Sequence, residues 1–123
     1  MKKIIMSIKP EYVKDILKGT KKYEYRTKIP KEKINKIIIY CTSPVKKVIA
    51  EVDILDTLSL NPKILWEKTK KFSGIDKMFF NNYFKNRKIG HAYKLGKFVK
   101  YKEEKTLNDF GINYPPQSFC YIE

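Results

Sequence analysis

The stretch from Gly19 to Arg26 restricts the fold more than any other, because it joins a helix pattern directly to a strand pattern. Before it, four apolar residues recur at the spacing of one buried helical face: Tyr12, Val13, Ile16 and Leu17. Gly19 favours the left-handed conformation that ends a helix. From Thr20 to Arg26 the side chains alternate between two faces, as they do on a strand. Because this strand carries so many charges, we expect it not to be buried on both faces, with Glu24 and Arg26 paired on one of them.

Strand patterns dominate the rest of the chain. Apolar or alternating runs predict strands over residues 3–7, 36–40, 45–58, 91–95, 97–105 and 118–122. Helix patterns begin at Pro10 and at Asn61-Pro62, break at Ser73-Gly74 and resume over residues 75–85, and a short helical turn is expected at 31–34. Five aromatic residues of the later helices are expected to pack in the core rather than to stack on a base: Trp66, Phe79, Phe80, Tyr83 and Phe84. This order of elements suits an α+β fold, a small and strongly bent mixed β-barrel with helices at its ends.

Length and motifs exclude several classes of protein. At 123 residues the chain is expected to form a single domain, 1–123, with a modest core. Cys41 and Cys120 are too few and too far apart for a metal cluster or a disulfide framework, so buried thiols in a reducing compartment are expected. No apolar run reaches membrane-spanning length and no secretory leader is recognisable, which predicts a cytoplasmic protein without a membrane partner. Cofactor and metal motifs are absent from the sequence, so no cofactor and no metal are expected.

The charge balance points to a polyanionic partner. Lys and Arg number 27 against 13 Asp and Glu, a formal net charge of +14. Such an excess on a small domain attracts nucleic acid. Only Arg26 and Arg87 among the basic residues are arginines, which fits an AT-rich coding sequence. That bias explains lysine in place of arginine, but it does not explain the excess of basic over acidic residues.

Four features, in this order, resemble the ASCH domain, which has a PUA-like fold. They are Ile8-Lys9-Pro10 before the first helix, the G-x-K-x-x-E-x-R pattern from Gly19 to Arg26, the turn from Ile39 to Pro44, and Trp66 in a later helix. The likeness covers nearly the whole chain and implies a PUA-like mixed β-barrel. It also implies that the loops at 7–11, 19–26 and 40–47 flank one cleft between the barrel and the first helix.

The resemblance implies a set of binding residues in that cleft: Lys9, Lys21, Tyr23, Glu24, Arg26, Tyr40, Thr42 and Ser43. The three cations can clamp a phosphate, Glu24 or the hydroxyls can read a base edge, and either tyrosine can stack on the base. The preferred interpretation is a nucleic-acid-binding module that holds a nucleotide or modified base, with RNA favoured over DNA. The plainer alternative is a set of solvated cations with a salt bridge at Glu24.

An enzyme is the second interpretation. Some ASCH-like proteins resemble amidohydrolases that remove the acetyl group of N4-acetylcytidine, with a Lys at the G-x-K position, a Thr three residues later and a more distant Glu. Lys21 matches, but Glu24 occupies the place of the Thr. Thr42 or Ser43 could supply the hydroxyl and Glu51 the carboxylate. Lys21 would act as the base, and Glu24 would hold it in its charged form.

Two further interpretations remain open at this point. Other ASCH proteins resemble ribonucleases, for which a histidine is useful, and His91 is the only histidine in the sequence. A lone histidine on a strand is more often packed or solvated than catalytic. The last alternative is a protein-interaction module, in which the positive charge plays no part.

Overall fold

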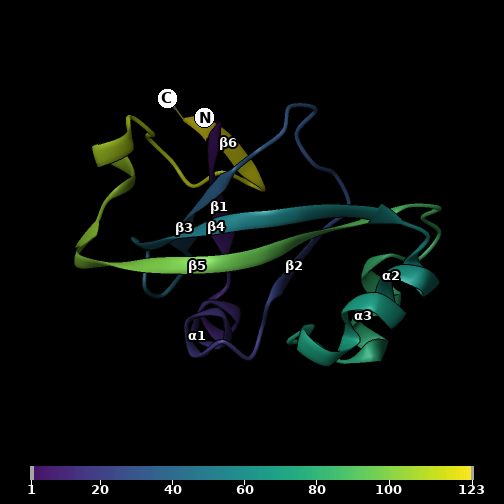
Figure 1. Ribbon diagram of the computed structural model, residues 1–123. Helices are drawn as coiled ribbons and strands as arrows, with labels where there is room; N and C mark the ends of the chain where they lie inside the picture. The colour runs from purple at the N-terminus through teal and green to yellow at the C-terminus, as the bar shows by residue number, and fades with distance from the viewer. Residues whose placement is uncertain (1, 123) are drawn as a thin grey trace.

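The fold is a curled sheet of six strands with helices at its ends, seen in a computed structural model that describes residues 2–122 (Figure 1). The elements in chain order are β1 (Lys3–Ile8), α1 (Pro10–Lys18), β2 (Tyr23–Arg26), β3 (Lys36–Cys41), β4 (Lys47–Leu60), α2 (Pro62–Thr69), the 3-10 turn η1 (Lys70–Phe72), α3 (Lys77–Tyr83), β5 (Gly90–Lys105), the 3-10 turn η2 (Leu107–Phe110) and β6 (Phe119–Ile122). The strand order is β2-β5-β4-β3-β1-β6, and only the β1–β3 pair is parallel. The α+β class and the bent mixed sheet are confirmed.

The continuous apolar runs form the centre of the sheet, where both faces are covered. Ile4 and Ile37 point towards α1 and pack with its Val13 and Ile16. Their neighbours on the opposite face, including Ile5, Ile38 and Tyr40, pack against the segment around η2: Leu107, Phe110 and Ile112. Burial on both faces explains why β1 and β3 are apolar throughout rather than alternating.

The start and end of α1 and the start of α2 are as the sequence predicts, whereas α3, at Lys77–Tyr83, is shorter than the predicted 75–85. Pro10 occupies the first turn of α1, and Gly19 ends that helix at φ 83°. The Asn61 side chain accepts a hydrogen bond from the Lys63 backbone N–H at the start of α2. Gly74, at φ 70°, separates η1 from α3. These residues act on their immediate neighbours, so these helix boundaries form without distant contacts.

The structure differs from the prediction in three further places. Residues 31–34 form no helix; Ile34 is instead buried in the core, and Asn35 bonds through its backbone to Lys2 and Ile54. The second strand begins only at Tyr23. Two predicted strands at 91–95 and 97–105 are one continuous strand, β5, because Gly96 continues the strand while packing closely on Leu55. A Cβ at Gly96 would lie 2.8 Å from the Leu55 side chain.

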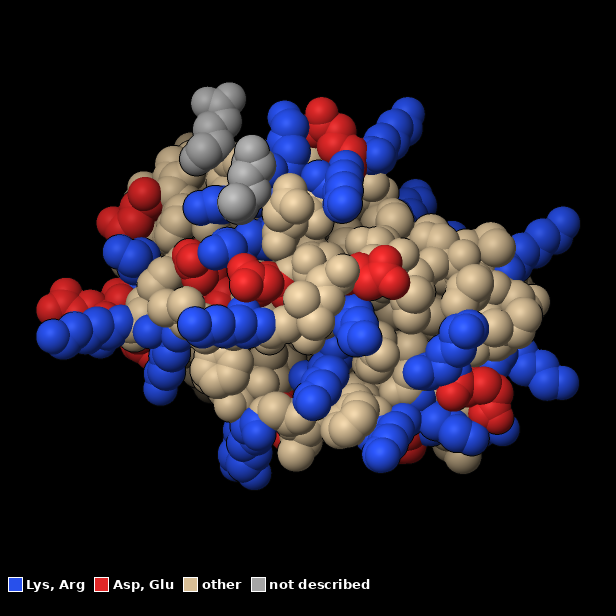
Figure 2. All heavy atoms as spheres, viewed as in Figure 1, with Lys and Arg blue, Asp and Glu red and all other residues tan. Residues whose placement is uncertain are grey.

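Lysines project from every side of the face shown in Figure 2 and do not gather in one patch.

The thiol of Cys41 is buried, as predicted, whereas Cys120 is partly exposed. Both are free cysteines. Within residues 2–122, the helices are all too short or too polar to cross a bilayer.

Candidate functional site

A cavity of about 500 Å³ lies where β2, the end of β1 and α3 approach one another. Its volume is within the range of small-molecule sites. Four parts of the chain supply its walls: Ser7, Lys9 and Tyr12 from the β1–α1 region, Lys21, Glu24 and Arg26 from β2 and the residues before it, Ile75, Phe79 and Tyr83 from the α3 region, and Gln117 and Ser118 before β6. The cavity therefore combines charged, aromatic and small polar side chains.

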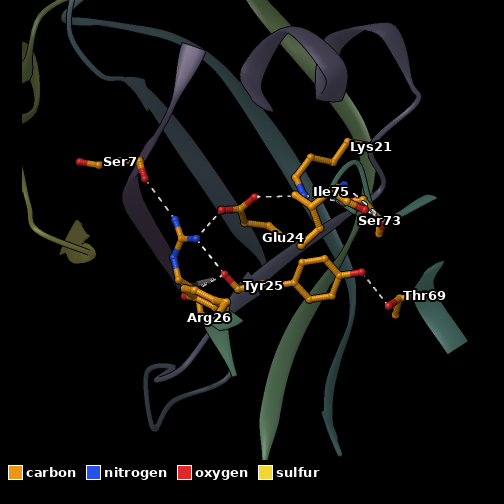
Figure 3. Close-up of polar contacts among 9 residues, drawn as sticks. Ser7, Lys21, Glu24, Tyr25, Arg26, Thr69, Ser73 and Ile75 are labelled. Carbon is orange, nitrogen blue, oxygen red and sulfur yellow. Dashed lines mark hydrogen bonds and ion pairs between the residues drawn. The ribbon is translucent and has the colours of Figure 1, made fainter. Parts of the chain in front are cut away.

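Two charged residues form the floor of this cavity, and both are buried. Lys21 is 2% exposed and Glu24 is 4% exposed, and Tyr25 on the opposite face of the strand is buried as well. The expectation that this charged strand is not buried on both faces is therefore wrong. The Lys21 ammonium donates to the Ser73 carbonyl oxygen at 2.7 Å and lies 3.9 Å from Glu24 Oε1 (Figure 3). These partners replace water and allow a lysine to be buried here.

Arg26 connects this floor to the other side of the sheet. Its Nη1 pairs with Glu24 Oε2 and donates to the Tyr25 carbonyl oxygen at 2.9 Å. Its Nη2 donates to the Ser7 carbonyl oxygen of β1 at 3.1 Å (Figure 3). The predicted pairing of Glu24 with Arg26 is confirmed. Because β2 is an edge strand and β1 lies near the opposite edge, one guanidinium spans the opening of the curled sheet.

The surroundings of the Lys21 amine lower its pKa from the usual value for lysine. Burial is the main cause, since removing the ammonium from water disfavours its charged form, and Arg26 acts in the same direction. Glu24 opposes both by favouring the charged form. The amine also lies over the rings of Tyr12 and Tyr25, at 5.3 Å and 5.1 Å from their centroids. Lys21 is thus a fixed amine whose proton is held less tightly than on a solvated lysine.

The turn at Ser73 and Gly74 holds the Lys21 side chain in place. A Cβ built at Gly74 would lie 2.6 Å from Lys21 Cγ, closer than side chains approach one another. Gly74 also has φ 70°, which favours glycine. The turn therefore covers the aliphatic stem of Lys21, while the Ser73 carbonyl oxygen accepts a hydrogen bond from its ammonium.

An aromatic wall, Phe79 and Tyr83 of α3 with Tyr12 of α1, faces this floor. The Phe79 and Tyr83 rings stack with an interplanar angle of 11°, and Tyr12 meets Phe79 edge-on with centroids 6.3 Å apart. Phe80 and Phe84, on the other side of α3, are buried in the core as predicted. The prediction that Phe79 also belongs to the core is wrong. In the sequence, Phe79 and Tyr83 are four residues apart, and so are Phe80 and Phe84. This spacing is the one signal that places each pair on its own side of the helix.

The structure brings together four of the residues expected in the cleft: Lys9, Lys21, Glu24 and Arg26. The other four lie outside it. Tyr40 is 3% exposed and packs with Ile5 and Val48, so its ring has no free face for a base. Tyr23 packs against the core beneath α2 and α3. Thr42 and Ser43 belong to the turn between β3 and β4, which does not line the cavity, so the expected single cleft does not include this turn.

The residues considered for hydrolysis are also apart from Lys21. His91 hydrogen-bonds Ser59 at 2.8 Å on an exposed part of β4 and β5. Glu51 is engaged by Lys36 Nζ at 3.0 Å and by the Tyr101 hydroxyl at 2.9 Å. Neither lines the cavity. Among the residues that the structure describes, no three His, Cys, Asp or Glu side chains cluster as metal ligands would.

Comparison with known proteins identifies relatives of very different lengths. The chain is 32% identical over 123 residues to ATP synthase subunit alpha of Ureaplasma parvum, covering 98% of this chain and 15% of that protein. It is 31% identical over 100 residues to large ribosomal subunit protein uL22 of the same organism, covering 80% of this chain and 32% of that protein. The chain thus spans less than a third of either relative. An ASCH domain-containing ribonuclease of Zymomonas mobilis is 26% identical over 125 residues, with 98% of this chain and 84% of that protein covered.

Solved structures and a family model agree on the classification. A crystal structure of ASCH from Zymomonas mobilis has a TM-score of 0.88 and 25% identity, and covers 98% of this chain and 87% of that chain. A mutant of the same protein has a TM-score of 0.89 and 24% identity, and covers 100% of this chain and 91% of that chain. The ASCH domain family model matches residues 6–113. This chain therefore belongs to the ASCH domain family.

Proposed function

We propose that this domain binds RNA and holds one nucleotide in the cavity around Lys21 and Arg26. The observation that carries the proposal is the composition of the cavity, where a buried charge network faces an aromatic wall and an exposed Lys9 stands at the rim. A net charge of +14 attracts the nucleic-acid backbone. The ribonuclease name of the Zymomonas mobilis relative supports RNA as the ligand. The cellular compartment that we propose is the cytoplasm.

The proposal assigns phosphate binding to the rim. Lys9 is exposed, and no hydrogen bond or ion pair engages its side chain among the described residues, so its ammonium is free to meet a phosphate. Lys21 and Arg26 already have protein partners. They contribute positive charge from within the cavity and fix its shape.

The test compares two exposed lysines, Lys9 at the cavity rim and Lys102 on β5 outside the cavity. Lys9→Ala and Lys102→Ala remove the same charge, and neither disturbs a buried group. Affinity for a labelled single-stranded RNA is measured by fluorescence anisotropy at one salt concentration. Lys9→Ala is expected to weaken binding more than Lys102→Ala. Equal losses would show diffuse attraction without a site, and absence of binding by the unaltered protein would overturn the proposal.

Hydrolysis is the second candidate, and the lowered pKa of Lys21 is the observation that favours it. An amine that gives up its proton more readily serves better as a general base. The candidate substrates are N4-acetylcytidine and RNA. Turnover would be established if the unaltered protein releases cytidine or RNA fragments and Lys21→Met does not. The urea midpoint of Lys21→Met must equal that of the unaltered protein. No release by the unaltered protein at high concentration would leave Lys21 as a binding residue.

A further inference from the structure

One residue of the aromatic wall stays substantially exposed. Phe79 is 42% exposed although it lines the cavity. Its position is fixed from several sides: the Asp76 carboxylate accepts from the Phe79 backbone N–H at 2.7 Å, and Tyr83 stacks on its ring. The Tyr83 hydroxyl in turn donates to the Tyr25 carbonyl oxygen at 3.3 Å. A partly exposed aromatic ring held between such neighbours is suited to stacking against a flat ligand.

The floor beside this wall disfavours a phosphate. The Glu24 carboxylate is buried there, and an anion placed next to it would meet a like charge. Arg26 donates to Glu24, to the Tyr25 carbonyl and to the Ser7 carbonyl, and Lys21 donates to the Ser73 carbonyl. Their N–H groups already have protein acceptors, so a phosphate at the floor would have to compete with Glu24 and these carbonyls for them. The negative faces of the aromatic rings add to the exclusion of an anion.

The rim has the opposite character. Lys9 is exposed at the start of α1, on the side of the cavity where the chain leaves β1. A phosphate at this point would contact a solvated ammonium and would stay away from Glu24. The charges thus separate an inner part suited to a neutral ring from an outer part suited to the backbone.

We infer that the cavity receives the base of the nucleotide, with Phe79 as the residue on which the base stacks and the phosphate outside at Lys9. The inference rests on the proposed RNA-binding function and specifies its ligand. A base in a duplex is already stacked on its neighbours and paired, so it cannot reach Phe79. The ligand is therefore an unpaired nucleotide of single-stranded RNA.

Phe98 provides a matched control for Phe79. It is also a phenylalanine, is 37% exposed, and lies on β5 outside the cavity. Binding of the unaltered protein, Phe79→Ala and Phe98→Ala is measured for an RNA oligomer and for an abasic oligomer of the same length. Phe79→Ala is expected to weaken RNA binding roughly five- to a hundredfold, the range for loss of one stacked aromatic. Phe98→Ala should bind as the unaltered protein does, and Phe79→Trp should retain affinity.

The abasic oligomer separates stacking from backbone attraction. All four proteins, Phe79→Trp included, are expected to bind it weakly and equally, because it has no base to stack. An equal loss for RNA in Phe79→Ala and Phe98→Ala, or the same Phe79→Ala loss on the abasic oligomer, would overturn the assignment of Phe79 while RNA binding stands. If duplex RNA binds as tightly as single-stranded RNA, the inference that the ligand is an unpaired nucleotide is overturned. No RNA binding at all would overturn this inference and the proposed function together.

Discussion

Glu24 is a buried carboxylate that lies between two buried or partly buried cations. It pairs with Arg26 on one oxygen and lies 3.9 Å from the Lys21 ammonium on the other. Without Glu24 both positive charges would stay in a poorly solvated site with no compensating charge. The stability of the cavity therefore depends on this residue more than on either cation alone.

Glu24→Ala is expected to lower the free energy of unfolding by about 3 to 5 kcal/mol, the usual cost of breaking a buried ion pair. Urea denaturation followed by circular dichroism measures the change. Glu67→Ala is the control, because Glu67 on α2 forms an exposed pair with Lys70 and should change stability little. A small loss for Glu24→Ala would mean that water solvates Lys21 and Arg26 once the carboxylate is gone.

Tyr93 has a buried hydroxyl that finds no hydrogen-bond partner among residues 2–122. Replacing it by Phe removes an unsatisfied group, so Tyr93→Phe should be as stable as the unaltered protein at pH 7, or more stable. Burial also raises the pKa of Tyr93 to about 12, whereas an unfolded tyrosine ionises near pH 10.

The sign of the pH effect follows from these two pKa values. Below pH 10 the hydroxyl is protonated in both states, and between 10 and 12 only the unfolded chain releases the proton, so stability falls as pH rises. Urea midpoints at pH 9, 10 and 11 are expected to fall less in Tyr93→Phe than in the unaltered protein. Parallel curves would show that Tyr93 does not contribute to the alkaline loss.

Among the elements, the turn between η1 and α3 positions the Lys21 side chain, and two glycines allow this to be tested. Gly74 and Gly111 both have positive φ, 70° and 74°, but a Cβ would meet Lys21 only at Gly74 and nothing within 4 Å at Gly111. Gly111→Ala should cost about 1 to 2 kcal/mol for the left-handed backbone. Gly74→Ala should cost about 1 to 3 kcal/mol more, because the methyl group overpacks a buried site. If urea denaturation shows the same loss of unfolding free energy for both variants, the Lys21 side chain moves away from the added methyl group without a further loss of stability.

Local signals account for the elements that were predicted correctly. Pro10, Gly19 and Asn61 act on the residues beside them, and the apolar runs of β1 and β3 identify central strands without reference to any partner. The burial of Lys21 was not predictable in this way. Glu24 supplies the nearby counter-charge, but the direct hydrogen-bond acceptor is the Ser73 carbonyl, 52 positions away in the sequence. Only the assembled fold shows that the charge is tolerated.

The site was predictable only in part, for the same reason. The G-x-K-x-x-E-x-R pattern located Lys21, Glu24 and Arg26, which do line one cavity. From the sequence alone, the opposite wall is expected in the core, because the spacing separates two aromatic pairs but does not say which pair faces inward until α3 is docked. Phe80 then faces Trp66, at 4.9 Å between ring centroids, and Phe79 faces the cavity.

On the scale of the whole molecule, charge and stacking should respond differently to salt. The net charge of +14 makes RNA affinity fall steeply with salt, because each phosphate neutralised on a single strand adds about 0.7 to the logarithmic slope. Stacking on Phe79 releases no counterions. The affinity ratio between the unaltered protein and Phe79→Ala is therefore expected to stay constant from low to high salt. Anisotropy titrations at two or more salt concentrations measure it, and a ratio that vanishes at high salt would assign the Phe79 effect to the backbone contacts.

The pairing of β1 with β6 places Lys3 opposite Ile122, so the polypeptide enters and leaves the domain at one point (Figure 1). The cavity lies at the far ends of these same two strands, beside Ser7 and Ser118. A domain with neighbouring termini can be spliced into a surface loop of another protein without stretching either connection. In such a fusion the host protein would lie beside Lys3 and Ile122, and the cavity residues Ser7 and Ser118 would lie at the opposite ends of the two strands.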